Sequence, residues 1–152
     1  MLLKRGGGTR SGVLIVSVLL ALALPSCGGG GGSPAGPSNA PQVVAQGNFA
    51  VGRIGAPNFA VFFPFSTSRS GRLDITVDWT FASNDLDFGV ARGACDLALI
   101  TADQCVEVAS AESTTKPERL SLPSFQAGAY TLVIANLGSG NESGTYQVVL
   151  QP

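Results

Sequence analysis

The stretch LDITVDW, residues 73–79, alternates apolar and polar side chains over seven consecutive positions. Alternate side chains of a β-strand point to opposite faces, so this pattern predicts a strand that is buried on one side only. The buried face comprises Leu73, Ile75, Val77 and Trp79, and the solvated face comprises Asp74, Thr76 and Asp78. One face therefore belongs to a core and the other to solvent.

The same alternation recurs along the chain, and turns that contain glycine separate the segments. It appears at residues 86–90, 130–134 and 146–150, and further strands are expected near Phe49, at 60–65, near Val106 and at 119–122. Pro64 marks a sheet edge or a strand end, because proline cannot donate to a strand ladder. Residues 96–102 form at most a single helical turn. About eight short strands in roughly 110 residues predict an all-β fold, an antiparallel β-sandwich of jelly-roll type.

The N-terminal segment has the layout of a secretory signal. Basic side chains at Lys4, Arg5 and Arg10 precede twelve apolar residues, 13–24. As a helix this apolar run would span about 18 Å, well short of the roughly 30 Å core of a bilayer. We therefore expect it to direct export rather than to remain as a membrane span.

Cys27 follows this segment and precedes five consecutive glycines. The residues Leu24-Pro25-Ser26-Cys27 resemble the bacterial lipobox, in which acyl chains such as palmitate are attached to the cysteine and the peptide is cleaved before it. Two or more acyl chains on one residue anchor a protein stably to a membrane. We expect a lipid-anchored protein of the bacterial envelope, on the periplasmic or cell-surface side. The alternative is an ordinary signal peptide followed by a cysteine without a role.

These features divide the chain into a signal peptide at residues 1–26, a lipidated cysteine with a Gly/Ser/Pro linker at 27–42, and a β-sandwich domain at 43–152. A flexible linker of about fourteen residues reaches roughly 20 Å, so it would hold the domain off a membrane surface. After cleavage, six Lys and Arg side chains oppose ten Asp and Glu side chains, a net charge of −4. This balance provides no basic patch for nucleic acid.

Two long segments carry an ordered set of short motifs: NFAVFFPFSTSRSGRLDITVDWTFASNDLDFGVARG, residues 58–93, and ERLSLPSFQAGAYTLVIANLGSGNESGTYQVVLQP, residues 118–152. The order is an aromatic-rich strand, a glycine turn into a strand that ends at Trp79, an Asp-Leu-Asp strand, and a closing hairpin with two Gly-x-Tyr motifs. Together they resemble the bacterial pre-peptidase C-terminal domain over roughly residues 47–151. The resemblance implies a jelly-roll β-sandwich, usually an accessory module of exported enzymes, with some relatives that bind collagen or other polymers. Here a lipid-anchor motif precedes the domain instead of a peptidase.

Cys95 and Cys105 are the two cysteines that remain once Cys27 carries lipid. An exported protein meets an oxidising compartment, where an even pair of cysteines favours a disulfide. Closing so short a loop stabilises a fold by roughly 3 kcal/mol in the chain-entropy model. A metal or redox site is the alternative, but the chain has no CxxC motif and no histidine.

The chain lacks the usual catalytic groups. The absence of histidine removes the commonest general base and every Ser-His-Asp or Cys-His arrangement. Lys116, the only lysine beyond the signal segment, precedes a proline in a polar turn. We therefore expect a protein that is not an enzyme and that has no resident cofactor, apart from the Ca²⁺ hypothesis that follows.

Asp85 and Asp87 stand two positions apart on a predicted strand and therefore share one face. With Asp74 and Asp78 on a neighbouring strand, they would gather oxygen ligands of the kind that Ca²⁺ prefers. The hypothesis is a Ca²⁺ site formed by these four aspartates. The simpler interpretation is a solvated strand face with turn-capping aspartates, and a catalytic carboxylate pair is a third.

Phe63 and Phe81 are the candidate ligand-binding aromatics, since an exposed ring would suit a glycan or a polymer. Phe62 and Phe63 are adjacent and point to opposite faces, so both are core only if their strand is covered on both sides. Trp79 shares the register of the buried face of its strand and belongs inside. The alternative is that all these rings fill the interior of the sandwich.

The sequence therefore predicts a lipid-anchored, non-catalytic β-sandwich that binds a glycan, an extracellular polymer or a protein ligand. The alternative is a structural or assembly accessory that docks or stabilises an exported enzyme. An exposed aromatic and acidic patch would favour binding, and a uniformly polar surface would favour the structural role.

Overall fold

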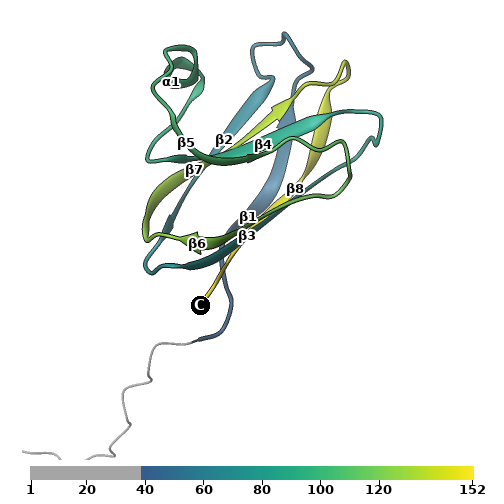
Figure 1. Ribbon diagram of the computed structural model, residues 1–152. Coiled ribbons are helices and arrows are strands. Elements are labelled where there is room, and N and C mark those ends of the chain that lie inside the picture. The colour runs from purple at the N-terminus through teal and green to yellow at the C-terminus, as the bar shows by residue number, and fades with distance from the viewer. Residues whose placement is uncertain (1–38) are drawn as a thin grey trace, which may run out of the picture. The chain divides into compact units, whose positions relative to one another are not determined.

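The computed structural model describes residues 39–152; the signal segment, Cys27 and most of the linker lie outside the described residues. Eight strands and one five-residue helix follow one another along the described chain. They are β1 (Gln42–Val51), β2 (Ala60–Thr67), β3 (Gly71–Trp79), β4 (Leu86–Arg92), α1 (Leu97–Thr101), β5 (Val106–Ala111), β6 (Glu118–Phe125), β7 (Gly128–Asn136) and β8 (Glu142–Gln151) (Figure 1). The predicted eight strands and the single helical turn are confirmed.

The strands form two four-stranded antiparallel sheets that pack face to face (Figure 1). The first sheet has the order β1-β8-β3-β6, and the second has the order β2-β7-β4-β5. Every connection crosses between the sheets except the one from β4 to β5, which carries α1. Eight strands in this order form a jelly roll, so the predicted β-sandwich of jelly-roll type is confirmed.

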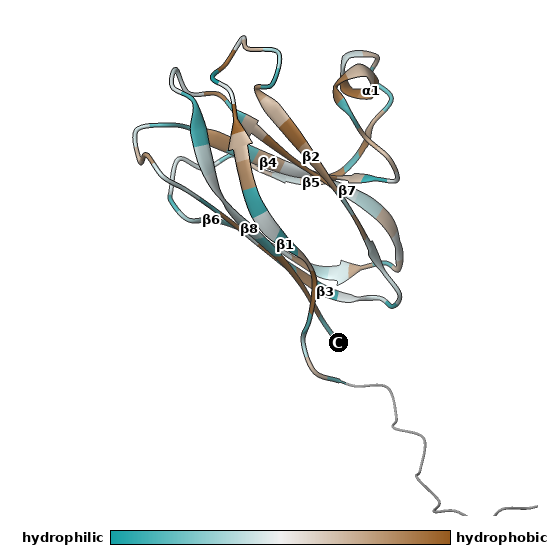
Figure 2. Cartoon of the chain, turned by 180° about the vertical axis from the view of Figure 1, so that it is seen from behind, coloured by the Kyte–Doolittle hydropathy of each residue, from teal (hydrophilic) through white to brown (hydrophobic). Residues whose placement is uncertain are grey.

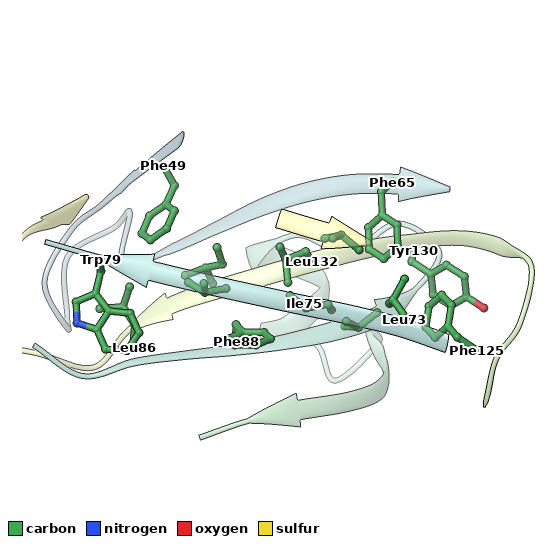
Figure 3. Packing of buried hydrophobic residues seen from close by; sticks show 14 of the residues in the cluster. Phe49, Phe65, Leu73, Ile75, Trp79, Leu86, Phe88, Phe125, Tyr130 and Leu132 are labelled. Atoms are coloured by element: carbon green, nitrogen blue, oxygen red, sulfur yellow. The ribbon is translucent and has the colours of Figure 1, made fainter. Parts of the chain in front are cut away.

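The core lies between the sheets and takes one side chain in two from each central strand. On β3 the buried residues are Leu73, Ile75, Val77 and Trp79, the alternation that the sequence predicts. Figure 3 shows Trp79, Leu86 and Phe49 at one end of this layer and the rings of Phe65, Phe125 and Tyr130 at the other. These last three rings contact one another, with centroids 4.3 to 6.4 Å apart.

An edge strand of the second sheet contains a proline. Pro64 lies on β2, an edge strand, opposite Thr131 of β7, where a missing amide donor costs no ladder bond on the free side. Figure 2 shows the apolar colour along β2 and β7. Among residues 39–152, no helix has the length and apolar character needed to cross a membrane.

The α1 segment, residues 93–105, lies on the outer side of the second sheet in both Figure 1 and Figure 2. Asp96 caps the helix, because its side chain accepts a hydrogen bond of 2.9 Å from the amide of Leu99. Cys95 and Cys105 form a disulfide that closes this segment at its base. The predicted pairing is therefore present, and it fixes a loop above the outer face of the sheet.

Candidate functional site

The outer face of the second sheet is built of small side chains. On β4, Leu86, Phe88 and Val90 point into the core, so Asp87, Gly89 and Ala91 point outward. The register places Ala135 beside Asp87, and Val133 and Ser110 on either side of Gly89. Small residues leave the backbone of the sheet close to the surface at its centre.

A groove of about 350 Å³ lies between this face and the α1 segment. Such a volume is within the range of sites that accept a few side chains or a small ligand. Its floor is the outer face of β4 and β7, and its walls are the disulfide loop and β5. The lining residues that carry the argument below are Asp87, Gly89, Asp103, Glu107, Glu112 and Val133.

Four carboxylates line the groove, and none of its described lining residues is Lys or Arg. Asp87 comes from β4, Asp103 from the α1 segment, Glu107 from β5, and Glu112 from the residue that follows β5. Burial, together with the charges of Asp85 and Glu112, raises the pKa of Asp87 above its ordinary value. The described ion pairs join Arg72 to Asp74 and Lys116 to Asp78, all outside the groove. The groove is therefore an uncompensated negative site.

Gly89 lies on the floor of the groove and has no side chain that would fill it. A Cβ atom at this position would meet the Ala109 carbonyl oxygen at 3.4 Å and the Ser110 Cβ at 3.7 Å, which is ordinary contact. The sheet does not require glycine here for packing, and its φ is not in the left-handed region. A glycine in a central strand often marks a place where another chain or a ligand approaches the backbone closely.

A buried carboxyl group, that of Glu118, lies near the acidic side chains of the groove. Glu118 of β6 is 2% exposed, and its Oε1 accepts a hydrogen bond from the Ser113 amide. Its Oε2 has no hydrogen-bond partner among the described residues, and neither has Oδ1 of Asp85. Burial raises the pKa of Glu118, as do the nearby charges of Asp87, Asp85 and Glu112, although the Ser113 hydrogen bond acts in the opposite direction. Sequence reasoning did not identify Glu118, because its neighbours come from other strands.

The four aspartates of the Ca²⁺ hypothesis do not form one cluster. Asp74 and Asp78 lie on β3 in the first sheet, whereas Asp87 lies on β4 in the second sheet, with Asp85 just before it. The expectation that they occupy neighbouring strands is wrong, because the chain crosses between the sheets after β3. Among residues 39–152, no three His, Cys, Asp or Glu side chains form a group that could hold a metal ion.

Asp74 and Asp78 have partners of their own on the outer face of the first sheet. Asp74 accepts hydrogen bonds from Arg72 at 2.9 Å, from Ser121 at 2.6 Å and from Gln151. Burial alone would raise the pKa of Asp74, but these hydrogen bonds and the Arg72 charge hold it below the ordinary value. Asp78 lies 3.6 Å from the Lys116 ammonium group. Asp74 and Asp78 therefore belong to a hydrogen-bonded and ion-paired strand face.

The two candidate aromatics differ in exposure. Phe63 packs against the core, and its ring centroid lies 4.3 Å from that of Tyr146, so it does not form an open platform. Phe81 is 58% exposed on the loop that follows β3. Trp79 is buried, as its register predicts. Of the predicted ligand-binding rings, only Phe81 is available to a partner.

Phe81 belongs to a group of loops at the end of the sandwich where β1, β3 and β7 finish. The amide of Ile54 donates to the Gly138 carbonyl at 3.0 Å, and the amide of Leu137 donates to the Asp85 carbonyl at 2.8 Å. These bonds join three loops, residues 52–59, 80–85 and 137–141, which we call the distal loops, and each carries one exposed large apolar side chain. The three side chains are Ile54, Phe81 and Leu137.

A buried glutamate at the start of β8 holds the loop between β3 and β4 in place. Glu142 is 4% exposed, and its two carboxylate oxygens accept four hydrogen bonds of 2.8 to 3.1 Å. The donors are the amides of Thr80, Phe81 and Ser143 and the side-chain amide of Asn84. Burial alone would raise the pKa of Glu142, but these hydrogen bonds hold it below its ordinary value. Sequence reasoning missed this residue, since it appears there only as a polar residue in a glycine-rich turn.

A second hollow lies on the outer face of the first sheet. It is lined mainly by polar side chains and includes both an acidic and a basic residue, Asp78 and Arg119. The Arg119 guanidinium group donates to the Thr76 hydroxyl at 3.2 Å. Its mixed charge distinguishes this surface from the uniformly acidic groove on the opposite sheet.

The strand order and the pairing define a jelly-roll β-sandwich. The chain is similar to the solved structure of the pre-peptidase C-terminal domain of a collagenase from Bacillus anthracis. The two share 12% sequence identity with a TM-score of 0.50, and the match covers 70% of this chain and 87% of the other. No family model and no curated protein matches the sequence. At this identity the likeness concerns the fold, and it confirms the fold that the sequence motifs imply.

Proposed function

We propose that this protein is a non-catalytic binding module of the bacterial envelope, and that its ligand binds in the acidic groove. The observation that carries the proposal is the groove itself, a concave surface of about 350 Å³ with four carboxylates and no Lys or Arg among its described lining residues. A surface of this kind is suited to recognition, because it combines a shaped floor with unpaired charge.

The residues of the chain favour binding over catalysis. The sequence has no histidine, and Lys116 is engaged with Asp78 at 3.6 Å and with the Thr80 carbonyl at 3.2 Å. Ser110 and Ser121 donate hydrogen bonds to the carboxylates of Glu107 and Asp74, but neither contact includes a histidine base, and the two described cysteines form a disulfide. The fold of a pre-peptidase C-terminal domain, which in the similar structure is one domain of a collagenase, is consistent with an accessory role.

The proposal places the module on a membrane through lipid on Cys27. This step rests on the lipobox-like residues 24–27 and on the glycine tract after them. The first strand begins at Gln42, immediately after the linker, and pairs there with the end of β8. The distal loops lie at the opposite end of β1.

The proposal is tested by a binding screen of the full chain in detergent against glycans, extracellular polymers and exported proteins, with and without Ca²⁺. The matched variant is Gly89→Leu, which fills the floor of the groove. We expect at least one ligand to bind the wild-type chain and to lose most of its affinity for this variant. A ligand that binds both proteins equally would place the site elsewhere, and the absence of any ligand would contradict the proposal.

A second function is favoured by the distal loops. Ile54, Phe81 and Leu137 are exposed on loops that backbone hydrogen bonds join, and Glu142 fixes the loop of Phe81, which is an arrangement suited to docking another protein. In this alternative the domain is an assembly accessory that stabilises an exported enzyme. The discriminating variant is Phe81→Ser, which should abolish capture of such a protein while Gly89→Leu leaves capture unchanged.

A further inference from the structure

Glu118 occupies a position of β6 that faces the core of the sandwich. β6 pairs with β3 in a register that places Glu118 directly opposite Val77. Residues directly opposite each other in an antiparallel pair share one face of the sheet, and Val77 lies on the buried face of β3. The Glu118 side chain therefore points inward, which agrees with its exposure of 2%. An acidic group thus occupies a position where the strand pattern favours an apolar one.

The carboxyl group of Glu118 has one hydrogen-bond donor for its two oxygens. Oε1 accepts a hydrogen bond from the Ser113 amide, which belongs to the segment 112–117 between β5 in the second sheet and β6 in the first. Oε2 is buried and has no hydrogen-bond partner among the described residues. A buried carboxylate is costly unless it is paired or fully hydrogen-bonded, so the ionised form of Glu118 is poorly stabilised at this position.

Three other carboxyl groups act on Glu118, and they come from the second sheet and its connections. Asp87 lies on β4, Asp85 lies just before it, and Glu112 directly follows β5. Glu107, the acidic residue within β5, instead lines the groove on the outer face of that sheet. We call Asp85, Asp87, Glu112 and Glu118 the carboxyl cluster. The cluster therefore brings like charges together across the boundary between the two sheets.

The cations on the elements nearest to Glu118 are engaged away from the carboxyl cluster. The Lys116 ammonium group lies 3.6 Å from the Asp78 carboxylate and donates to the Thr80 carbonyl at 3.2 Å. The Arg119 guanidinium group donates to the Thr76 hydroxyl at 3.2 Å. Like charges without a cation among them ionise only at a cost in free energy, so the cluster favours the retention of a proton.

A second oxygen of the carboxyl cluster is also buried without a hydrogen-bond partner among the described residues. It is Oδ1 of Asp85. A proton on Oε2 of Glu118 turns that oxygen from an acceptor into a donor. One proton therefore lowers the repulsion between the sheets and gives the cluster a donor where it otherwise has only acceptors.

We infer that the carboxyl cluster is a proton-dependent latch between the two sheets, which is closed while Oε2 of Glu118 carries a proton. As pH rises the proton passes to solvent, and the Glu118 carboxylate then repels the carboxylates of the second sheet. The segment 112–117 joins the two sides, because Glu112 begins it and the Ser113 amide is bonded to Glu118, so this segment loosens first. The inference goes beyond the proposed function and does not depend on it.

The latch stabilises the fold at acid pH. Burial and the charges of Asp87, Asp85 and Glu112 raise the pKa of Glu118 above its ordinary value near 4.5, although the Ser113 hydrogen bond acts in the opposite direction. A carboxyl group whose pKa is raised in the folded state contributes stability that is complete below the unfolded value and is lost as pH rises through the folded value. The contribution of Glu118 to the free energy of unfolding should therefore fall as pH rises above about 4.5.

The first test compares the wild-type chain with Glu118→Gln by urea unfolding in detergent, from about pH 4 to about pH 8. Glutamine stays neutral and keeps an acceptor oxygen for the Ser113 amide, so the variant holds the latch closed at every pH. A tenfold change in proton affinity corresponds to about 1.4 kcal/mol, or about 0.5–1.4 M in the urea midpoint of a small domain. We expect the midpoint of the variant, relative to wild type, to rise by about 0.5 M or more across this range. The control is Glu107→Gln, the same change on an exposed residue of β5, which should leave the pH dependence unchanged.

The second test measures the protonation directly in the wild-type chain and does not depend on the folding of a variant. A nuclear magnetic resonance titration of the glutamate carboxyl carbons, assigned through the backbone, should show that Glu118 titrates above its ordinary range. Hydrogen exchange, corrected for the intrinsic effect of pH, should show that the amides of residues 112–117 lose protection as Glu118 ionises, whereas the amides of the central strand β7 keep it.

Three results would overturn the inference. They are a Glu118 carboxyl that titrates at or below the ordinary value, an identical pH dependence in the wild-type chain and Glu118→Gln, and a cation in place of the proton. The last is shown if millimolar CaCl₂ abolishes the raised titration of Glu118 and protects residues 112–117 at alkaline pH. None of these measurements uses a ligand of the groove, so failure of the latch leaves the proposed function intact, and the Gly89→Leu screen tests that function separately.

Discussion

Glu142→Gln should be among the most destabilising single changes in the domain. The carboxylate of Glu142 accepts four hydrogen bonds, two on each oxygen, and the residue is 4% exposed. Glutamine keeps one acceptor oxygen and replaces the other with an NH₂ donor. Two N–H donors that are buried or partly buried would then face another donor, at a cost of about 1–3 kcal/mol for each.

The expected loss is about 2–5 kcal/mol in the free energy of unfolding, against a total of roughly 5–15 kcal/mol for a domain. For a domain of this size such a loss lowers the melting temperature by about 10 °C or more. Urea unfolding and thermal melting of the full chain measure the two quantities. The control is Glu107→Gln, the same chemical change on an exposed residue of β5, which should change stability by less than about 0.5 kcal/mol.

The difference between the wild-type chain and Glu142→Gln should also depend on pH. The pKa of Glu142 is lowered in the folded state, so its stabilisation is complete above the unfolded value near 4.5 and is lost as pH falls through the lower folded value. The difference should therefore be constant near neutral pH and should shrink below about pH 4.5. A loss under about 1 kcal/mol at pH 7, or a difference that grows at acid pH, would refute the role assigned to Glu142.

Three further changes test other parts of the account. Gly144→Ala should destabilise the domain by about 1–3 kcal/mol, because its Cβ would lie 2.1 Å from the Asp78 carbonyl oxygen and 2.6 Å from the Phe49 ring, whereas Gly89→Ala should be close to neutral in the same unfolding assay. Replacing both Cys95 and Cys105 with serine should cost about 2–3 kcal/mol in the free energy of unfolding, from the short loop that the bond closes; an unchanged urea midpoint would contradict this. Cys27→Ser should release the protein from membranes or leave an uncleaved precursor, and unchanged membrane fractionation and processing would argue against lipid attachment.

Local patterns predicted the strands well because burial alternates along strands such as β3 and β8. The alternation of LDITVDW appears directly in the burial of β3, and Pro64 lies on an edge strand as its missing amide requires. The disulfide was also predictable, because Cys95 and Cys105 are close in sequence and pair without other candidates among the described residues. These features depend on neighbours along the chain.

The sites were harder to predict because they depend on which sheet each strand joins. Asp78 and Asp85 are only seven positions apart, yet the chain crosses between sheets from β3 to β4, so the proposed group of four aspartates does not form. The groove brings Glu107 of β5 and Glu112, the residue after β5, to the same face of the sheet as Asp87 of β4, an arrangement that no local motif reveals. Glu142 likewise gains its role only when the loop between β3 and β4 lies against the start of β8. Two candidate residues were identified from the sequence. Asp87 was predicted as a Ca²⁺ ligand, whereas the structure places it in the groove, and Phe81 was predicted as an exposed ring, which it is.

The central claim is that the outer face of β4, β5 and β7 is the ligand-binding surface. The most direct measurement is the change of amide chemical shifts by nuclear magnetic resonance when the isotope-labelled chain is titrated with a ligand from the screen. The account predicts that the largest changes fall on Asp87, Gly89, Glu107 and Glu112, and that they are lost in Gly89→Leu. Changes confined to the distal loops around Phe81, or to the first sheet around Arg119, would contradict it.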